Sequence, residues 1–145
     1  MSDFNPDPAD LAAQCAETLP PLARRGVALF NQGDYFEAHE LLEEAWRAER
    51  RPVREFYRVV LQAAVAYYKI RQGNYNGAIK MITRLRRWAQ PFPPCCQGLA
   101  LAALLADIDR VESELLRLGP ERIERFPHSL FKPVRLEGDK NDGNG

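Results

Sequence analysis

The segment FNQGDYFEAHELLEEAW, residues 30–46, concentrates side chains that can bind ligands or transfer protons. In a helix, His39, Glu43 and Trp46 would follow one another along one flank, because their spacings of four and three residues each correspond to about one turn. An imidazole with a carboxylate one turn away could chelate a divalent metal, or form an acid–base pair in which the carboxylate fixes the imidazole tautomer. Two ligands are too few for a metal site, and the residues assign no reaction to the pair.

A second helix is expected to bring Gln62 to the same place. The short link at residues 50–52 returns the chain antiparallel, which sets His39 roughly level with Gln62. A polar pocket bounded by His39, Glu43, Trp46 and Gln62 is therefore geometrically feasible. The candidate ligand-binding residues are His39, Glu40, Glu43, Trp46 and Gln62, and the candidate metal ligands are His39 and Glu43.

The same residues also have a purely structural interpretation. The imidazole and its carboxylate neighbour could simply share a hydrogen bond on the helix surface. Glu37 stands three residues after Asp34, the spacing of a capping box that would satisfy free amides at the helix start. Arg58 falls level with Glu43 and Glu44, so a salt bridge could use those carboxylates. Under this interpretation the polar residues only lock helices together.

Hydrophobic periodicity predicts an all-helical chain. Apolar residues recur at intervals of three and four without sustained alternation, so no strand is expected. The predicted helices cover residues 8–19, 21–30, 35–49, 52–72, 75–89 and 98–118. The segment PFPPCC, residues 91–96, should be a rigid extended connector because of its three prolines. After residue 119 we expect a single helical turn near 121–125, an extended arm over the bundle, and a disordered tail, GDKNDGNG.

The predicted fold is all-α: a compact bundle of about five to six helices built around two antiparallel helical hairpins. The helix at 52–72 is apolar almost all round and should lie at the centre. Its polar strip must meet water or other polar groups, and consists of Glu55, Arg58, Gln62 and Lys69. We expect an N-terminal lead with a short helix at 1–24, the bundle at 25–118, and a C-terminal arm and tail at 119–145.

A faint internal repeat supports the paired hairpins. The segments GDYFEAHELLEEAWR and GNYNGAIKMITRLRR align Gly, Tyr, Ala and Arg at an offset of 40 residues. Each is preceded by an apolar helix, and the pattern of a small residue, a turn glycine, an aromatic and then Ala is the one that two-helix repeats use to pack helices closely. The structural motif residues are Gly33, Asp34, Glu37, Gly73 and Asn74.

Composition limits the class of protein. At 145 residues and 46% hydrophobic, the chain fits one domain. Twenty basic and twenty acidic residues balance, so no long-range field favours nucleic acid or an anionic membrane, and neither partner is expected. The apolar stretches are far shorter than the about 20 residues of a membrane span. The amino terminus, MSDFNPDPAD, lacks a signal-peptide pattern, so we expect a cytoplasmic protein.

The three cysteines do not form the pattern of a disulfide framework. Cys15 stands alone, and Cys95 and Cys96 are adjacent. We therefore expect reduced thiols. The adjacent pair could hold a soft metal or respond to oxidant, but it lacks the four ligands of a structural zinc site.

A basic strip marks the helix at 75–89, where Lys80, Arg84 and Arg87 lie close together with Arg86 beside them. Such a strip can bind phosphate or RNA. With zero net charge and no aromatic stacking platform beside it, a solvated face or a set of interhelical ion pairs is the better interpretation.

The pair of segments FNQGDYFEAHELLEEAW and VLQAAVAYYKIRQGNYNGA resembles the all-helical family known as domain of unknown function 309. The resemblance extends over residues 25–118. Its most specific residues are Gly33, Tyr35, Glu37, Ala38, His39, Glu40, Glu43 and Trp46, followed by Gln62, Gly73, Asn74, Gly77 and Ala78. The resemblance implies a compact helical domain in which the Glu-Ala-His-Glu segment faces the helix of Gln62. It implies no activity, because none is established for the family.

Two functional hypotheses remain open at this point. One is a polar pocket for a small ligand or divalent metal, in which His39 would ligate or handle a proton, Glu43 would assist it, Trp46 would form a wall and Gln62 would orient the guest. The other is a non-enzymatic interaction module that binds a partner protein or forms a homo-oligomer. Whether the protein is an enzyme is left undecided.

Overall fold

The computed structural model describes residues 4–137, which form the predicted helical bundle. Its elements are α1 Pro8–Cys15, α2 Pro21–Asn31, α3 Tyr35–Ala48, α4 Arg54–Arg71, α5 Tyr75–Ala89, β1 Cys95–Cys96, β2 Leu99–Ala100, α6 Leu101–Leu118, and the 3-10 helices η1 Pro120–Arg125 and η2 His128–Leu130. The tail predicted to be disordered, residues 138–145, lies outside the described residues. No helix within residues 4–137 combines the length and apolarity needed to cross a membrane.

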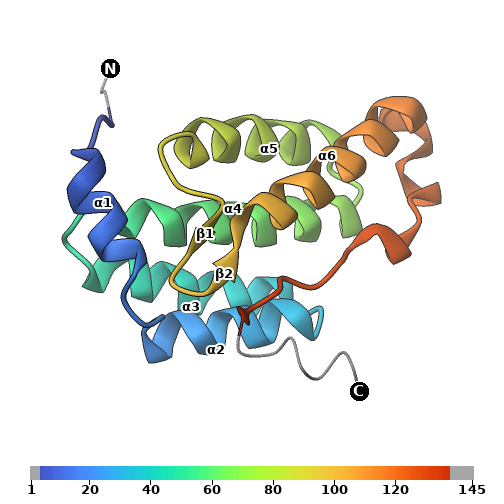
Figure 1. Cartoon of the computed structure of the whole chain (residues 1–145). Coiled ribbons are helices and arrows are strands. Elements are labelled where there is room, and N and C mark those ends of the chain that lie inside the picture. Colours follow the sequence, from blue (N-terminus) through green and yellow to red (C-terminus); the bar gives the residue numbers. More distant parts are fainter. Residues whose placement is uncertain (1–3, 138–145) are drawn as a thin grey trace.

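Two helical hairpins, α2–α3 and α4–α5, confirm the predicted architecture (Figure 1). Both turn through a glycine in the left-handed region, with φ of +84° at Gly33 and +77° at Gly73. In each turn the next amide donates to a carbonyl five residues earlier, at 2.9 Å from Asp34 and 2.8 Å from Asn74. These are the backbone bonds of a glycine-terminated helix end. The repeat at an offset of 40 residues therefore marks two copies of one turn.

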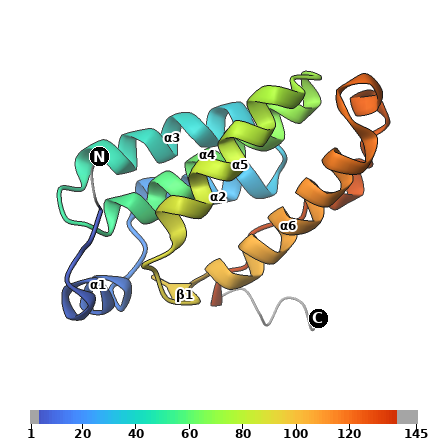
Figure 2. The ribbon, with the colours of Figure 1, turned by 90° about the horizontal axis from the view of Figure 1, so that it is seen from above.

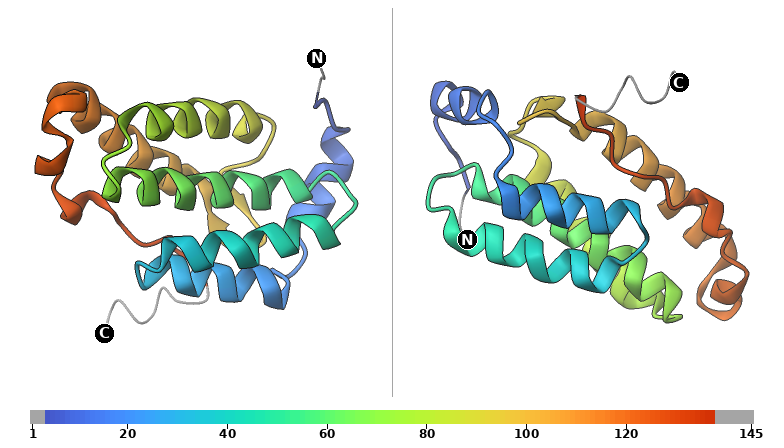
Figure 3. Two further views of the ribbon diagram at one scale, coloured as in Figure 1. Left: turned by 180° about the vertical axis from the view of Figure 1, so that it is seen from behind. Right: turned by 90° about the horizontal axis from the view of Figure 1, so that it is seen from below.

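Helix α4 lies at the centre, as its apolar circumference predicts. Its buried residues are Glu55, Phe56, Tyr57, Val59, Val60, Ala63, Ala64, Ala66, Tyr67 and Ile70. Helices α3 and α5 both pack against α4, and α2 packs against α3. Helix α6 and the arm after it lie on one side of this layer (Figure 2). The left view of Figure 3, from behind, shows no other described element over α3, α4 and α5.

A small β-hairpin follows α5, so the prediction of a strand-free chain was wrong. β1 and β2 pair antiparallel across a two-residue turn in which Gln97 and Gly98 have φ of +52° and +83°. Two successive positive φ values define the type I′ turn of tight hairpins. Strands of two residues leave no alternation to detect, and glutamine is not a usual first residue of this turn. Helix α6 consequently begins at Leu101 rather than at residue 98.

A disulfide joins Cys15, at the end of α1, to Cys96 in β1, so the expectation of reduced thiols was wrong for this pair. The Cα atoms are 4.4 Å apart although 81 residues separate them in sequence. Backbone and side-chain bonds hold the two segments together: the Gln97 amide donates to the Cys15 carbonyl at 2.7 Å, and its side chain donates to the Gln14 carbonyl at 3.0 Å. Cys95 remains a free, exposed thiol.

The predicted extended arm is confirmed by its contacts with α2 and β2. The side-chain amide of Asn31 accepts from the Val134 amide at 2.7 Å and donates to the Val134 carbonyl at 3.0 Å. Leu136 forms an isolated antiparallel bridge with Leu99. Val134 is buried, so the arm closes one side of the core.

Candidate functional site

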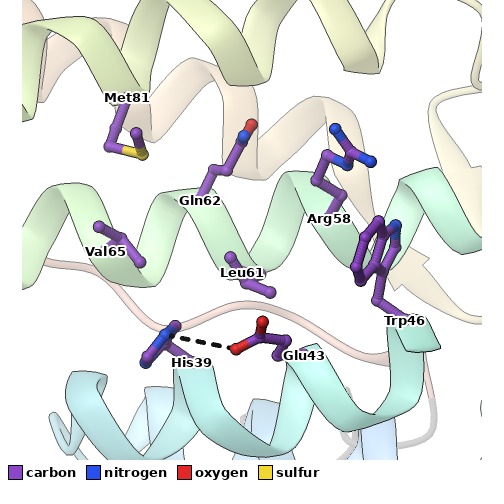
Figure 4. Close-up of a pocket in the computed structure, with 8 residues that line it drawn as sticks. All are labelled: His39, Glu43, Trp46, Arg58, Leu61, Gln62, Val65 and Met81. Carbon is purple, nitrogen blue, oxygen red and sulfur yellow. Dashed lines mark ion pairs between the residues drawn. The ribbon is translucent and has the colours of Figure 1, made fainter.

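A groove runs along the uncovered side of the layer, between α3 and α5, with α4 as its floor (Figure 4). The larger of its two hollows has a volume of about 330 Å³. The residues that line it are His39, Glu43, Trp46, Arg58, Leu61, Gln62, Val65 and Met81. The structure therefore brings together four of the five residues predicted for a pocket. Glu40 is exposed and is not among the lining residues.

A second hollow of about 180 Å³ continues the first toward the start of α3. Its lining residues are Tyr35, Phe36, His39, Val65, Tyr68, Lys69 and Gln72. The two hollows share His39 and Val65, so they form one channel, which we call the α3–α5 groove. Phe36, at 48% exposed, is one of two large hydrophobic residues left open to solvent among the described residues.

His39 lies at the middle of the groove with its side chain 26% exposed. Its Nδ1 is 3.0 Å from the Phe36 carbonyl, which favours the tautomer that donates from Nδ1. Its Nε2 is 3.8 Å from a Glu43 carboxylate oxygen (Figure 4). The other Glu43 oxygen accepts from Arg47 at 2.9 Å. The imidazole thus faces the groove, and its carboxylate neighbour is partly neutralised.

No further ligand joins the His39–Glu43 pair from the part of the chain that the structure describes. Among residues 4–137 there is no group of three or more His, Cys, Asp and Glu side chains placed to hold a metal ion. Any metal at this pair would need its remaining ligands from water or from a bound molecule.

One end of the groove is closed by a polar and aromatic cluster that the sequence did not predict. The Arg58 guanidinium lies between two indole rings, 4.8 Å from the centroid of Trp46 and 4.1 Å from that of Trp88. Glu55, 8% exposed, forms an ion pair with Arg58 at 2.7 Å and accepts a hydrogen bond from the Trp46 indole at 3.3 Å. The Arg54 guanidinium also lies over the Trp46 ring, 4.1 Å from its centroid. Cation–π contacts and charged hydrogen bonds therefore join α3, α4 and α5 here.

The cluster corrects the prediction that Arg58 pairs with Glu43 or Glu44. Its partner is Glu55, three residues earlier on the same helix, because that carboxylate is already beside it on the buried flank of α4. The spacing of three residues between Glu55 and Arg58 was the available signal in the sequence.

Gln62 reaches the groove from α4 without a hydrogen bond to His39. Its Oε1 atom is buried and has no partner among the described residues. A buried amide oxygen without a donor costs free energy, so a donor on water or on a guest molecule would be stabilising at this point.

Of the helix caps predicted at the starts of α3 and α5, only the one at α5 is present. The Asn74 side chain accepts from the Gly77 amide at 2.9 Å, which confirms its capping role at α5. The Asp34 side chain makes no such bond at α3, and Glu37 is exposed without a bond to the helix start, so the predicted capping box is wrong. The backbone of Asp34 instead completes the glycine turn.

The two helices that form the walls of the groove carry opposite charges on their exposed faces, which we call the rims. The exposed face of α3 presents Glu37, Glu40 and Glu44, and the exposed face of α5 presents Lys80, Arg84 and Arg87. None of these six side chains has an ion pair within residues 4–137. Only Arg86 of the predicted basic strip forms interhelical ion pairs, with Asp109 at 2.7 Å and Glu112 at 2.6 Å.

Comparison with known proteins identifies the segment that builds the groove. Residues 23–81 match the family described as "Domain of unknown function (DUF309)". The chain carries a DUF309 domain. All residues that line the α3–α5 groove lie inside the DUF309 segment, whereas the disulfide, the β-hairpin, α6 and the arm reach beyond it.

Two relatives of this chain bear names that describe no function. An "Uncharacterized protein" of Aquifex aeolicus (strain VF5) is 26% identical over 111 residues, which cover 76% of this chain and 32% of the relative. "Uncharacterized protein YpuF" of Bacillus subtilis (strain 168) is 41% identical over 107 residues, which cover 72% of this chain and 58% of YpuF. The chain thus spans about a third of one relative and somewhat over half of the other.

Proposed function

We propose that the DUF309 domain is a protein-interaction domain whose α3–α5 groove receives an amphipathic helix. The observation that carries this proposal is a largely apolar channel, uncovered by any described element, with Phe36 exposed at its edge. A soluble domain usually covers such a surface unless it has a binding role.

The dimensions favour a helix over a small ligand. Along α4 the groove extends from Arg58 to Gln72, which is about 21 Å at 1.5 Å per residue. An amphipathic helix of about four turns would place its apolar stripe along this length. The channel is open on the solvent side, whereas small-molecule sites usually enclose most of the ligand surface.

Site-specific photo-cross-linking in the cells that produce the protein tests the proposal. A photoreactive residue at position 36 should give an adduct with a helical segment of another polypeptide chain. The same residue at position 116 is the matched control, because Leu116 is 60% exposed on α6, away from the groove. The adduct at position 36 should disappear when Val65→Glu places a charge in the groove floor. Equal yields at positions 36 and 116, or an adduct indifferent to Val65→Glu, would count against a groove partner.

A small ligand is the second candidate, favoured by the buried Gln62 oxygen that has no donor. In this proposal a hydrogen-bond donor on the guest binds the Gln62 oxygen. The polar side of the guest contacts His39 and Glu43, and its apolar side packs against Trp46. A ligand-shift screen monitored by the two groove-end tryptophans should then give hits that Gln62→Leu weakens and His39→Ala alters. A screen without such hits removes this candidate.

We also propose that the protein acts in the cytoplasm. The Cys15–Cys96 disulfide speaks against this location, because disulfides are rare in reducing compartments. Alkylation of free thiols in rapidly acid-quenched cells separates the two expectations. Three alkylated cysteines fit a reducing cytoplasm, and one alkylated cysteine fits an oxidising compartment.

A further inference from the structure

The α3–α5 groove carries charges that match a second copy of itself. We infer that the partner seated on this face is another copy of the chain, arranged by a two-fold axis that runs parallel to α4. This inference rests on the proposed role of the groove as a docking surface, and it names the partner.

The first argument is the charge on the two rims. Glu40 and Glu44 are exposed on α3, and Lys80 and Arg84 are exposed on α5. These pairs occupy equivalent positions of the internal repeat, because each glutamate is 40 residues before its basic counterpart. None of the four side chains has an ion pair within the described chain, so all four remain available to a partner.

The second argument is that both rims lie at the same level along the groove. The turns that start α3 and α5 are neighbours, since the Arg71 guanidinium donates to the Gly33 carbonyl at 2.6 Å. The two helices run in the same direction from those turns. Equivalent repeat positions, such as Glu40 and Lys80, therefore lie at about the same height.

These positions select one symmetry axis. A two-fold axis parallel to α4 keeps the height of every residue and exchanges the two rims, so the acidic α3 of one copy faces the basic α5 of the other. A two-fold axis across the helices would set α3 against α3 and α5 against α5, which brings like charges together. Between the rims, Leu61 and Val65 of each copy would meet and lose contact with water.

Charge reversal on each rim tests this arrangement with the full chain. Sedimentation analysis at low ionic strength should show a dimer for the wild type, and added salt should weaken it. The acidic variant carries Lys80→Glu with Arg84→Glu, and the basic variant carries Glu40→Lys with Glu44→Lys. Each exposed pair contributes about two- to threefold, and two-fold symmetry makes four pairs repulsive in either variant. Each variant alone should therefore dimerise about 16- to 80-fold more weakly than the wild type.

Mixing the two variants gives the decisive result. At positions 40, 44, 80 and 84 the acidic variant carries only glutamates and the basic variant only lysines and an arginine. Each contact between these positions is therefore attractive again in the mixture, and a heterodimer should form. A control matched to the acidic variant, Arg125→Glu with Lys132→Glu, lowers the net charge by the same amount at exposed residues outside the groove and should dimerise as the wild type does. Far-ultraviolet circular dichroism confirms that each variant is folded.

Three outcomes overturn the inference: a wild type that stays monomeric up to about 0.5 mM, variants that dimerise as well as the wild type, or a mixture that forms no heterodimer. Failure of the dimer and failure of the groove function are distinguishable. A monomeric protein that still gives the groove-dependent adduct at position 36, with a different chain, removes the second copy and leaves the docking role. A monomer without that adduct removes both.

Discussion

Reduction of the Cys15–Cys96 disulfide should cost the protein a large part of its stability. The bond closes a loop across 81 residues, from α1 to β1. For a loop of this length, the chain-entropy relation gives a loss of about 4.5 kcal/mol at 25 °C when the bond is reduced, since the unfolded chain regains the conformations that the cross-link removed. A small domain has a free energy of unfolding of only about 5–15 kcal/mol, so this loss is readily measurable.

The folded state should survive reduction. Leu11 and Leu19 are buried on either side of Cys15, at 2% exposed each. The Gln14 side chain also accepts from the Val53 amide at 3.0 Å, which ties α1 to the start of α4. We therefore expect a reduced protein with the same helical content and a lower free energy of unfolding.

Urea unfolding with and without a phosphine reductant measures the loss. With a typical denaturant dependence of about 2 kcal/mol per molar urea, the midpoint should fall by about 2 M. The experiment uses a Cys95→Ser background, because Cys95 is the one free thiol among the described residues and lies next to Cys96. Burial raises the pKa of the Cys95 thiol, as does the Glu137 carboxylate, so its exchange with the disulfide should be slow at neutral pH.

Mass spectrometry of alkylated protein must first show that the oxidised sample holds the bond. Equal midpoints for a verified disulfide form and its reduced form would refute the entropic argument. Three free thiols in a sample purified without reductant would instead refute the pairing itself.

Further predictions concern single side chains of the core, each measured by chemical unfolding. Gly26→Ala should cost about 1–3 kcal/mol, because a Cβ there would lie 2.7 Å from Leu42 Cγ at the α2–α3 contact; an unchanged midpoint would mean that the helices separate freely. Tyr67→Phe should be neutral or stabilising by about 1 kcal/mol, because the Tyr67 hydroxyl is buried without a partner; a clear loss would indicate an ordered water on that hydroxyl. Glu55→Gln should cost about 1–3 kcal/mol by removing the charge that binds its arginine partner at 2.7 Å, and equal stability would show that the ion pair is dispensable. The free energy of unfolding should fall as the pH rises from 10 to 12, because burial raises the pKa of Tyr57 from 10.0 to about 12 and the unfolded chain therefore loses the Tyr57 hydroxyl proton at lower pH than the folded chain does. Tyr57→Phe should flatten the dependence of stability on pH over this range. An unaltered slope would contradict the assignment to Tyr57.

The fold was predictable where it depends on local patterns. The helices, the central position of α4 and the two glycine turns follow from hydrophobic spacing and from the residues that interrupt it. The neighbourhood of the groove was also predictable in part, because helical geometry and a short antiparallel link set His39 across from Gln62. The binding role of these residues stays a prediction.

The sequence did not predict which side chains pair with one another around the groove and along the arm. Arg58 had carboxylates of α3 within reach by sequence counting, yet it binds Glu55 between two indole rings. The outcome depends on the positions of Trp46 and Trp88, which come from different helices. Similarly, Asn31 holds the arm at Val134 through side-chain bonds across 103 residues, a contact with no local signal.

The sequence by itself determined the helices, their turns and the opposite charges of α3 and α5, because each of these depends on residues within one or two turns of one another. The tertiary structure decided the disulfide, the β-hairpin, the partner of Arg58 and the open face between α3 and α5. Those features require segments distant in sequence to meet at a particular distance and angle, and only the packing of the whole bundle sets that geometry.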